Sequence, residues 1–345
     1  MASPTNSPIK IVSYNILVPH YAHVNKPVLK DVTWEDRRDQ LVSRMVSLNP
    51  DVIGLQEVER FGSIAEKMWQ KGYTGLYSGR NNGEEEGCAI FYKTDRFQEI
   101  THQPFFFNDG TGRLAFMASL KTKDGKSIFN VLSTHIQYPM GNDKTEKEID
   151  ATQKFASTLA SPTIICGDFN VDPDSKYLSP LYIAGFKDSH KNSKKHSFDF
   201  SGNSSRIDFI FATPDINVIS ADVPGNTKDL STLKEPSDHL PIIAELTLPL
   251  NGDSKDEATQ MREIVEKLNS NQLAEAKALF AKLPTKIQNS VYGNVYELEK
   301  NNNSKAASHP RFGECAFLQQ DDQNVSNATR AAAITKYLDS VLLTI

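Results

Sequence analysis

The sequence is poor in cysteine and in long apolar runs, and each shortage excludes a class of protein. Its 345 residues include only three cysteines, Cys88, Cys166 and Cys315, which lie far apart. Such cysteines favour a reducing compartment and exclude a disulfide framework. No apolar run approaches the ~20 residues that span a membrane, and residues 1–10 carry no signal-peptide core. We therefore expect a cytoplasmic protein with no membrane partner.

An excess of positive charge is missing too. Lysine and arginine number 38 against 43 acidic residues, so the net charge is -5 at pH 7. This balance argues against a non-specific polyanion binder but leaves room for a local basic groove. The sequence has no Cys pair at zinc-ligand spacing and no Gly-x-Ser-x-Gly turn of a serine hydrolase. Zinc and serine-nucleophile chemistry are therefore disfavoured.

A polar stretch from Leu250 to Ser254 divides the chain, whose length exceeds that of a single core. Beyond it, apolar residues recur at helical spacing, beginning with Met261, Ile264 and Leu268, and a last helix is predicted over residues 329–343. We predict a catalytic domain over residues 1–250 and a helical extension over residues 251–345. The extension is a candidate docking site for a protein partner.

The first 250 residues read as strands and helices in alternation. Thr33 and Asp36 form a capping box that begins a helix, and Asn49-Pro50 ends it. The acidic loop from Gly83 to Glu86 is expected to be exposed to solvent. Further helices are predicted over residues 63–70 and 145–159, and strands over residues 9–17, 52–55, 88–92, 114–120, 127–133, 163–166, 205–211 and 242–248.

Polar side chains stand where several of these strands end. The apolar run at residues 163–166 stops at Gly167, Asp168 and Asn170. On an extended backbone Asp168 and Asn170 point to the same side, and Gly167 lets a phosphate or another backbone approach. Taken alone, the pattern also suits a strand exit with local hydrogen bonds. Glu57, at the tip of an apolar strand, is either salt-bridged or a cation ligand.

The pattern repeats along the chain, and the repetition favours a functional site. Strand ends and their loops converge in a folded sheet protein, so we expect the set to line a single cleft. Hard oxygen ligands with few carboxylates suit Mg²⁺ or Mn²⁺, which accept phosphate oxygens. The set is Asn15, Glu57, His135, Asp168, Asn170, Asp208, Asp238 and His239.

These residues lie in motifs that together resemble those of the endonuclease/exonuclease/phosphatase superfamily. The motifs are Tyr14-Asn15, Gln56-Glu57, Thr134-His135, Gly167-Asp168-Phe169-Asn170, Arg206-Ile207-Asp208 and Ser237-Asp238-His239. The resemblance covers about residues 9–250 and implies an α+β fold, a four-layer αββα sandwich of two mixed β-sheets. Residues 14–17, 86–93 and 197–200 are most similar to the carbon-catabolite-repression deadenylases, nocturnin and Angel.

The resemblance also implies roles for the metal and water ligands. Glu57 would be the principal metal carboxylate, with Asn15 beside it. Asp238 would support a second metal or the first metal's water. Asp168 would orient or deprotonate the attacking water, and Asn170 would hold a phosphoryl oxygen.

Two imidazoles and several substrate contacts complete the implied site. His239 would contact the scissile phosphate with its tautomer fixed by Asp208, and His135 would donate to the phosphate. Arg113, in place of an expected asparagine, is either a phosphate clamp or a surface arginine.

An adenine base would stack on an aromatic wall opposite Pro139. Phe198 and Phe200 are the candidates for this wall. Phe200 is favoured, because three extra residues before Asp208 predict a loop that frees it.

We therefore predict a Mg²⁺-dependent phosphodiesterase, a deadenylase-like 3′–5′ exoribonuclease acting on RNA with a preference for poly(A). The alternatives are a nucleotide or cofactor phosphatase, a DNA nuclease and a sphingomyelinase-like enzyme. A scaffold without activity is less favoured, because it would have no physical need to keep so many costly acids together.

Overall fold

The computed structural model describes residues 7–141, 143–200, 202–250, 261, 263–281, 283, 287, 288, 291 and 326–342. The chain separates into two compact units, Met1–Pro249 and Leu250–Ile345. This division falls at the polar stretch that interrupts the sequence pattern. Whether each unit folds by itself stays a prediction.

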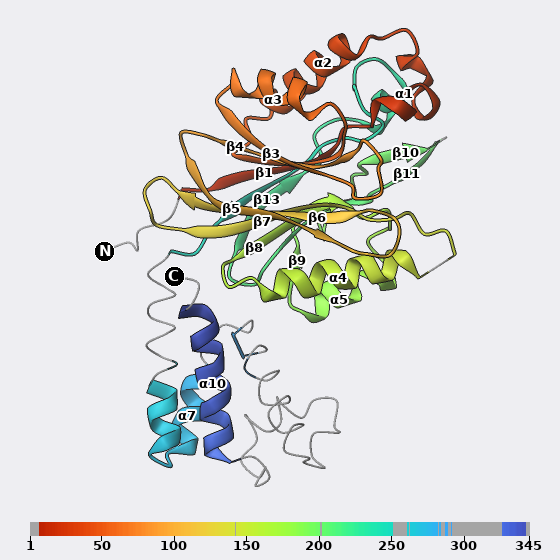
Figure 1. Ribbon diagram of the computed structural model, residues 1–345. Helices are drawn as coiled ribbons and strands as arrows, with labels where there is room; N and C mark the ends of the chain where they lie inside the picture. The colour runs from red at the N-terminus through yellow and green to blue at the C-terminus, as the bar shows by residue number, and fades with distance from the viewer. Residues whose placement is uncertain are drawn as a thin grey trace. The chain divides into compact units, whose positions relative to one another are not determined.

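A mixed six-stranded sheet forms one half of the first unit. Its strands, in spatial order, are β13 (Asn217–Asp222), β14 (Ile242–Thr247), β1 (Ile9–Asn15), β2 (Val52–Val58), β4 (Gly87–Lys93) and β3 (Tyr73–Gly79). Only β1 and β2 are parallel among the pairs of this sheet. Helices α2 (Trp34–Ser47) and α3 (Phe61–Trp69) cover its outer face, and α1 (Pro19–Asn25) follows β1 (Figure 1). Thr33 caps α2 by accepting from the Asp36 N–H, as the capping box predicts.

A second mixed six-stranded sheet packs against the first (Figure 1). Its strands are β5 (Phe97–Phe106), β6 (Leu114–Thr122), β7 (Ile128–His135), β8 (Thr163–Asp168), β12 (Asp208–Ala212) and β9 (Lys187–Asp188). Strands β7 and β8 are parallel. Helices α4 (Lys144–Thr158) and α5 (Ser179–Ile183) cover the outer face, and a separate hairpin joins β10 (Phe198–Phe200) to β11 (Asn203–Ser205). Short 3₁₀ helices span Pro27–Leu29, Lys176–Leu178 and Thr227–Ser231. The predicted four-layer sandwich is confirmed.

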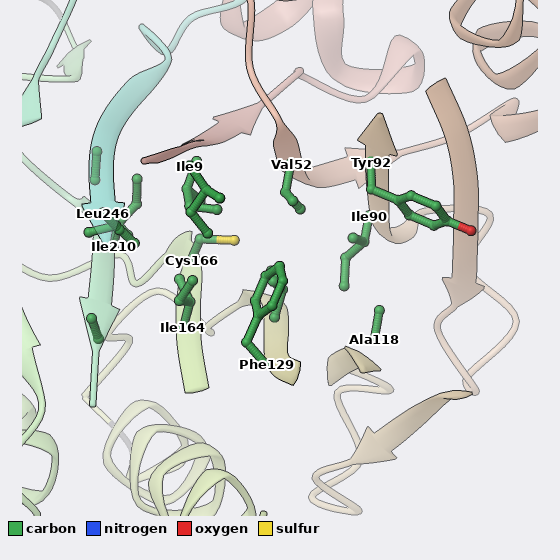
Figure 2. Close-up of a cluster of buried hydrophobic side chains, with 14 of the residues drawn as sticks. Ile9, Val52, Ile90, Tyr92, Ala118, Phe129, Ile164, Cys166, Ile210 and Leu246 are labelled. Carbon is green, nitrogen blue, oxygen red and sulfur yellow. The ribbon is translucent and has the colours of Figure 1, made fainter. Parts of the chain in front are cut away.

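Apolar side chains from both sheets fill the space between them. Figure 2 shows Ile9, Val52 and Ile90 of the first sheet facing Phe129, Ile164 and Ile210 of the second. All six are at most 2% exposed. Burying such a side chain stabilises the fold by about 1.5–3 kcal/mol, so this layer fixes the two sheets to each other. Alternation along β12 places Phe209 and Phe211 on the opposite face, in the cluster beneath α4.

One predicted strand is broken in the structure. The alternation over residues 205–211 predicts a continuous strand, but β11 ends at Ser205 and β12 begins at Asp208. The break falls at Arg206, whose buried guanidinium donates to Asp188, Nη2 to Oδ2 2.6 Å, and lies 4.3 Å from the centre of the Phe209 ring. Periodicity cannot reveal an ion pair between residues distant in sequence, so the prediction of one strand is wrong.

None of the four edge strands of the two six-stranded sheets was predicted. They are β3, β5, β9 and β13. Edge strands carry polar residues and prolines on their open side, as Pro104 in β5 illustrates. Their sequences therefore lack the apolar run or clean alternation that marks an inner strand.

The second unit has its own apolar cluster. The helical residues 263–269, α7 (Leu273–Phe280) and α10 (Asn327–Leu342) carry the repeats at helical spacing. Ile264, Leu268, Phe280 and Ile334 are buried together in this cluster, which confirms that the repeats are packing faces. Within the described ranges, no helix combines the length and apolar character that a membrane crossing needs.

A chain shortened to residues 1–251 is expected to stay folded and active. The first unit has its own core and contains every residue of the predicted site. We expect the thermal midpoint to shift by less than about 4 °C, which corresponds to about 1 kcal/mol in a domain of this size. Circular dichroism melting of the shortened and full-length chains tests this. Insoluble or inactive protein would show that the helices belong to the catalytic unit.

Candidate active site

The ends of neighbouring strands bring the predicted residues together. In the second sheet His135, Asp168 and Asp208 stand in register at the ends of β7 and β8 and the start of β12. Asn15 ends β1 in the first sheet, and its Nδ2 donates to Oδ2 of Asp168 at 3.0 Å. Polar groups of both sheets therefore meet in one place, as the sequence pattern predicts.

The backbone at the end of β8 requires glycine. A Cβ at Gly167 would lie 2.1 Å from the carbonyl oxygen of Thr134 in β7. The close pairing of β7 and β8 at this point sets Asp168 directly beside His135. Any larger residue at Gly167 would force these two strand ends apart.

Glu57 reaches the site through an irregular strand end. The pairing of β2 with β4 shifts between Leu55 and Val58, and Glu57 between them has a left-handed φ of 57°. Such a conformation costs of order 1–3 kcal/mol for a non-glycine residue. The half-buried carboxylate accepts from the Val18 N–H at 2.8 Å through Oε2 and from Asn15 through Oε1. The bulge thus redirects Glu57 toward the other polar residues.

Asn15 bridges two carboxylates. Its Nδ2 lies 3.0 Å from Glu57 Oε1 and 3.0 Å from Asp168 Oδ2, while its Oδ1 accepts from the Leu17 N–H at 3.0 Å. The side chain is completely buried. In this arrangement Asn15 positions the acids, and its expected role as a metal ligand stays a prediction.

His239 lies between two buried carboxylates. Its Nδ1 donates to Asp208 Oδ2 at 2.9 Å, and its Nε2 lies 3.7 Å from Asp168 Oδ2. Burial by itself lowers the pKa of His239, but the charges of Asp208 and Asp168 outweigh it and raise that pKa to about 10. The imidazole is therefore a cation at neutral pH, held in orientation by Asp208.

Asp168 is the point where the site's hydrogen bonds and charges converge. Burial and the nearby charge of Asp208 raise the pKa of Asp168 to about 7, against the opposing attraction of His239. Its Oδ1 accepts from the Asn170 N–H at 2.9 Å. A carboxylate with a pKa near neutrality can hold or release a proton at physiological pH.

His135 has the opposite protonation state from His239. Asn170 donates from Nδ2 to the Ile136 carbonyl at 2.9 Å and to His135 Nε2 at 3.2 Å. Since an amide nitrogen only donates, Nε2 of His135 must accept and the ring is neutral. Burial and the charges of Arg113 and Arg80 also hold the pKa of His135 well below its usual value. The site thus contains one neutral and one charged imidazole.

Arg113 is not a solvated surface arginine, which was one of its two predicted roles. The side chain is half-buried, and its Nη1 donates to the carbonyl oxygen of His135 at 3.0 Å. Its Nε is buried without a hydrogen-bond partner. Arg113 therefore holds the end of β7, and its role as a phosphate clamp stays a prediction.

The structure places the base-stacking candidates unequally. The half-buried Phe198 ring lies 4.7 Å from the His239 imidazole, centre to centre, at an angle of 39°. Phe200 pairs with Asn203 through its backbone, so the predicted loop is a hairpin, and its side chain lies outside the described residues. Pro139 is half-buried in the loop after β7.

Asp238 lies beside the charged pair and is half-buried. Ser237 Oγ lies 3.4 Å from its Oδ1. Burial and the charge of Glu57 raise the pKa of Asp238, against the attraction of His239. Its expected role as a support for a cation stays a prediction.

Residues 83–85 of the acidic loop are exposed, as predicted, but Glu86 lies in the site. It is 8% exposed and forms an ion pair with Arg80. One ligand atom each from Glu57, Glu86 and His135 lie within 4.8 Å of one another. The acidic composition of the loop led to the wrong expectation that Glu86 is exposed, but one feature of the sequence pointed to its place in the site. Glu86 directly precedes β4, so it too is an acid at a strand end.

The donor set fits a hard divalent cation. Two groups of described residues have ligand atoms close enough together to hold one metal ion. The first is Glu57, Glu86 and His135, and the second is Asp168, Asp208 and His239. Oε2 of Glu86 and Oδ1 of Asp208 are buried carboxylate oxygens without a hydrogen-bond partner. In the second group Nδ1 of His239 is already taken by the hydrogen bond to Asp208, and the charges of both carboxylates raise the pKa of His239, which disfavours binding of a cation there. The group around Glu57 is the better candidate.

Known proteins are similar to this chain in sequence. Carbon catabolite repressor protein 4 homolog 3 of Arabidopsis thaliana is 31% identical over 191 residues, 50% of this chain and 41% of that protein. The CCR4-Not complex 3′-5′-exoribonuclease subunit Ccr4 of Kluyveromyces lactis is 25% identical over 244 residues, 55% of this chain and 30% of that protein. The chain thus spans less than half the length of these relatives.

A solved structure shares the fold. ANGEL2, described as a 2′,3′-cyclic phosphatase in complex with adenosine-2′,3′-vanadate, superposes with a TM-score of 0.62 at 20% identity. The match covers 70% of this chain and 96% of that one. The model of the Endonuclease/Exonuclease/phosphatase family matches residues 12–239, which include every residue of the polar set from Asn15 to His239. That match exceeds half of the chain, so the protein belongs to the endonuclease/exonuclease/phosphatase family.

Proposed function

We propose that the protein is a Mg²⁺- or Mn²⁺-dependent phosphodiesterase that removes nucleotides from the 3′ end of RNA and prefers poly(A). One observation carries the chemistry. Asp168 Oδ2 accepts the Asn15 amide and faces the nitrogens of His135 and His239 at 3.6 and 3.7 Å. Asp168 as the base, His239 as the cationic donor and the cation site at Glu57 would thus lie next to one another. The name of one relative, a 3′-5′-exoribonuclease subunit, supports RNA as the substrate.

The cation would be held by Glu57, where it supplies positive charge that stabilises the negative charge developing on the phosphate. Asp168, with its pKa near 7, accepts a proton from the attacking water. The charged His239 donates from Nε2 to a phosphate oxygen while Asp208 fixes the ring through Nδ1. Asn170 holds His135 neutral, so the charge opposite the phosphate is concentrated on His239 and the cation.

Incubation with 5′-labelled oligo(A) and mixed-sequence RNA, with Mg²⁺ or with EDTA, tests the proposed function. We expect a ladder of labelled products that shorten from the 3′ end, release of adenosine monophosphate and no reaction in EDTA. Faster loss of oligo(A) would support the base preference. Inorganic phosphate released from nucleotides without shortening of RNA would instead identify a phosphatase, and nicked DNA a DNA nuclease.

Base preference is expected to depend on an aromatic wall beside His239. Replacing Phe198 by alanine should lower kcat/KM on oligo(A) by roughly 10-fold or more and affect oligo(U) less, because base stacking contributes about 1–3 kcal/mol and purines stack better. Phe200→Ala is the matched variant, since the sequence favoured Phe200, whereas the Phe198 ring lies 4.7 Å from the His239 imidazole. Equal losses on both substrates, or a lowered melting temperature, would assign the ring to the core.

A further inference from the structure

We propose that Glu86 is a second carboxylate of the divalent-cation site at Glu57, acting through a water molecule that the cation retains. The inference rests on the proposed function of that site. It assigns a role to an acid that the predicted catalytic set does not contain.

The backbone brings the two acids to one place. Val58 in β2 pairs with Gly87 in β4, and Glu57 and Glu86 each stand one residue before a member of this pair. A Cβ at Gly87 would lie 2.1 Å from the carbonyl oxygen of Ser78, so the start of β4 is tightly packed against β3. The position of Glu86 is therefore fixed by the sheet rather than by a free loop.

The described partners of Glu86 account for only one of its two carboxylate oxygens. Arg80 forms its ion pair with Oε1, while Oε2 is buried and has no hydrogen-bond partner among the residues that the structure describes. The residue as a whole is 8% exposed. Leaving a buried acceptor unpaired destabilises a protein, and more so when the group is charged. A cation or its bound water is the partner that would offset this cost.

Distance and donor type indicate how Glu86 acts. Its ligand atom lies within 4.8 Å of those of Glu57 and His135. Mg²⁺ forms bonds of about 2.1 Å, prefers carboxylate oxygens and keeps several waters. Because Glu57 already accepts two hydrogen bonds from Asn15 and Val18 and such a cation keeps several waters, we assign direct binding to Glu57 and a hydrogen bond to a retained water to Glu86. Arg80 balances part of the added negative charge.

Cation binding in the absence of substrate tests this assignment. Full-length protein stripped with EDTA is titrated with Mn²⁺ by calorimetry, as wild type, Glu86→Gln and the control Glu84→Gln. Glu84 also pairs with Arg80, but its side chain is 52% exposed. We expect Glu86→Gln to weaken Mn²⁺ binding by about 10- to 100-fold, the usual effect of losing a partner of a metal ligand. Glu84→Gln should bind as wild type does.

Two further variants separate the possible outcomes. Glu57→Gln should lose Mn²⁺ binding more severely than Glu86→Gln does. Wild-type affinity in Glu86→Gln combined with a loss in Glu57→Gln would overturn the role of Glu86 alone, whereas unchanged affinity in both would overturn the cation site itself. Should Glu86→Gln fail to fold, Glu86→Asp keeps the charge and shortens the side chain. Weakened binding in that variant supports the assignment, and unchanged binding contradicts it.

Discussion

Replacing Glu57 by glutamine is expected to lower turnover of an RNA substrate by at least about 100-fold, which corresponds to about 3 kcal/mol of lost transition-state stabilisation. The glutamine keeps the shape of the side chain and removes the negative charge that would hold the cation. The change should leave the fold intact, because Glu57 is half-buried and stands at a strand end outside the apolar core.

Steady-state kinetics on oligo(A) at saturating Mg²⁺, together with the thermal midpoint, measure this effect. Glu66→Gln is the control, since it removes the same charge from an exposed position on α3. Turnover close to that of wild type in Glu57→Gln would remove Glu57 from the cation site.

Replacing Asp208 by asparagine is expected to cost roughly 10²- to 10⁴-fold in kcat, the range of a positioned proton donor. Asp208 orients His239 through the 2.9 Å hydrogen bond and supplies charge that raises the pKa of His239 to about 10. Without that charge, burial dominates and the pKa of His239 falls. The residual activity of the variant should therefore decline as the pH rises from about 6 to 8, while wild-type His239 remains protonated throughout that range.

The same substitution should change the pH dependence of stability. The folded pKa of His239 is raised above its unfolded value of about 6.5. This histidine therefore contributes stability that is fully present below about pH 6.5 and is lost as the pH rises through about 10. Thermal melts of wild type and Asp208→Asn across this window measure the contribution. Asp222→Asn, whose side chain is 54% exposed, is the control. Identical pH profiles for wild type and Asp208→Asn would contradict the role of the pair.

The sequence predicted the inner strands and the residues at their ends for a physical reason. An apolar run buried between layers must end where polar groups can form hydrogen bonds. Asp168 and Glu57 could therefore be recognised in the sequence as polar residues that directly follow apolar runs. Edge strands such as β5 lack that contrast and were missed. The family resemblance, not periodicity, supplied the four-layer arrangement.

Contacts between distant residues explain what the sequence could not reveal. Arg80 forms an ion pair with Glu86 in a buried site, although the acidic sequence of the loop suggests exposure to solvent. Arg206 breaks a predicted strand by pairing with Asp188. The bridge that Asn15 makes between two carboxylates depends on two sheets meeting, which no spacing within one strand encodes.

Anomalous diffraction from crystals soaked in Mn²⁺ tests the central claim most directly, because it locates the cation without reference to any substrate. The account predicts one strong peak within about 2.2 Å of the Glu57 carboxylate, the bond length that such a cation requires. Glu86 should contact a water bound to the ion rather than the ion itself. A peak between the carboxylates of Asp168 and Asp208, at the position that the His239 imidazole occupies, would contradict the proposed hydrolytic centre. So would the absence of a peak near Glu57.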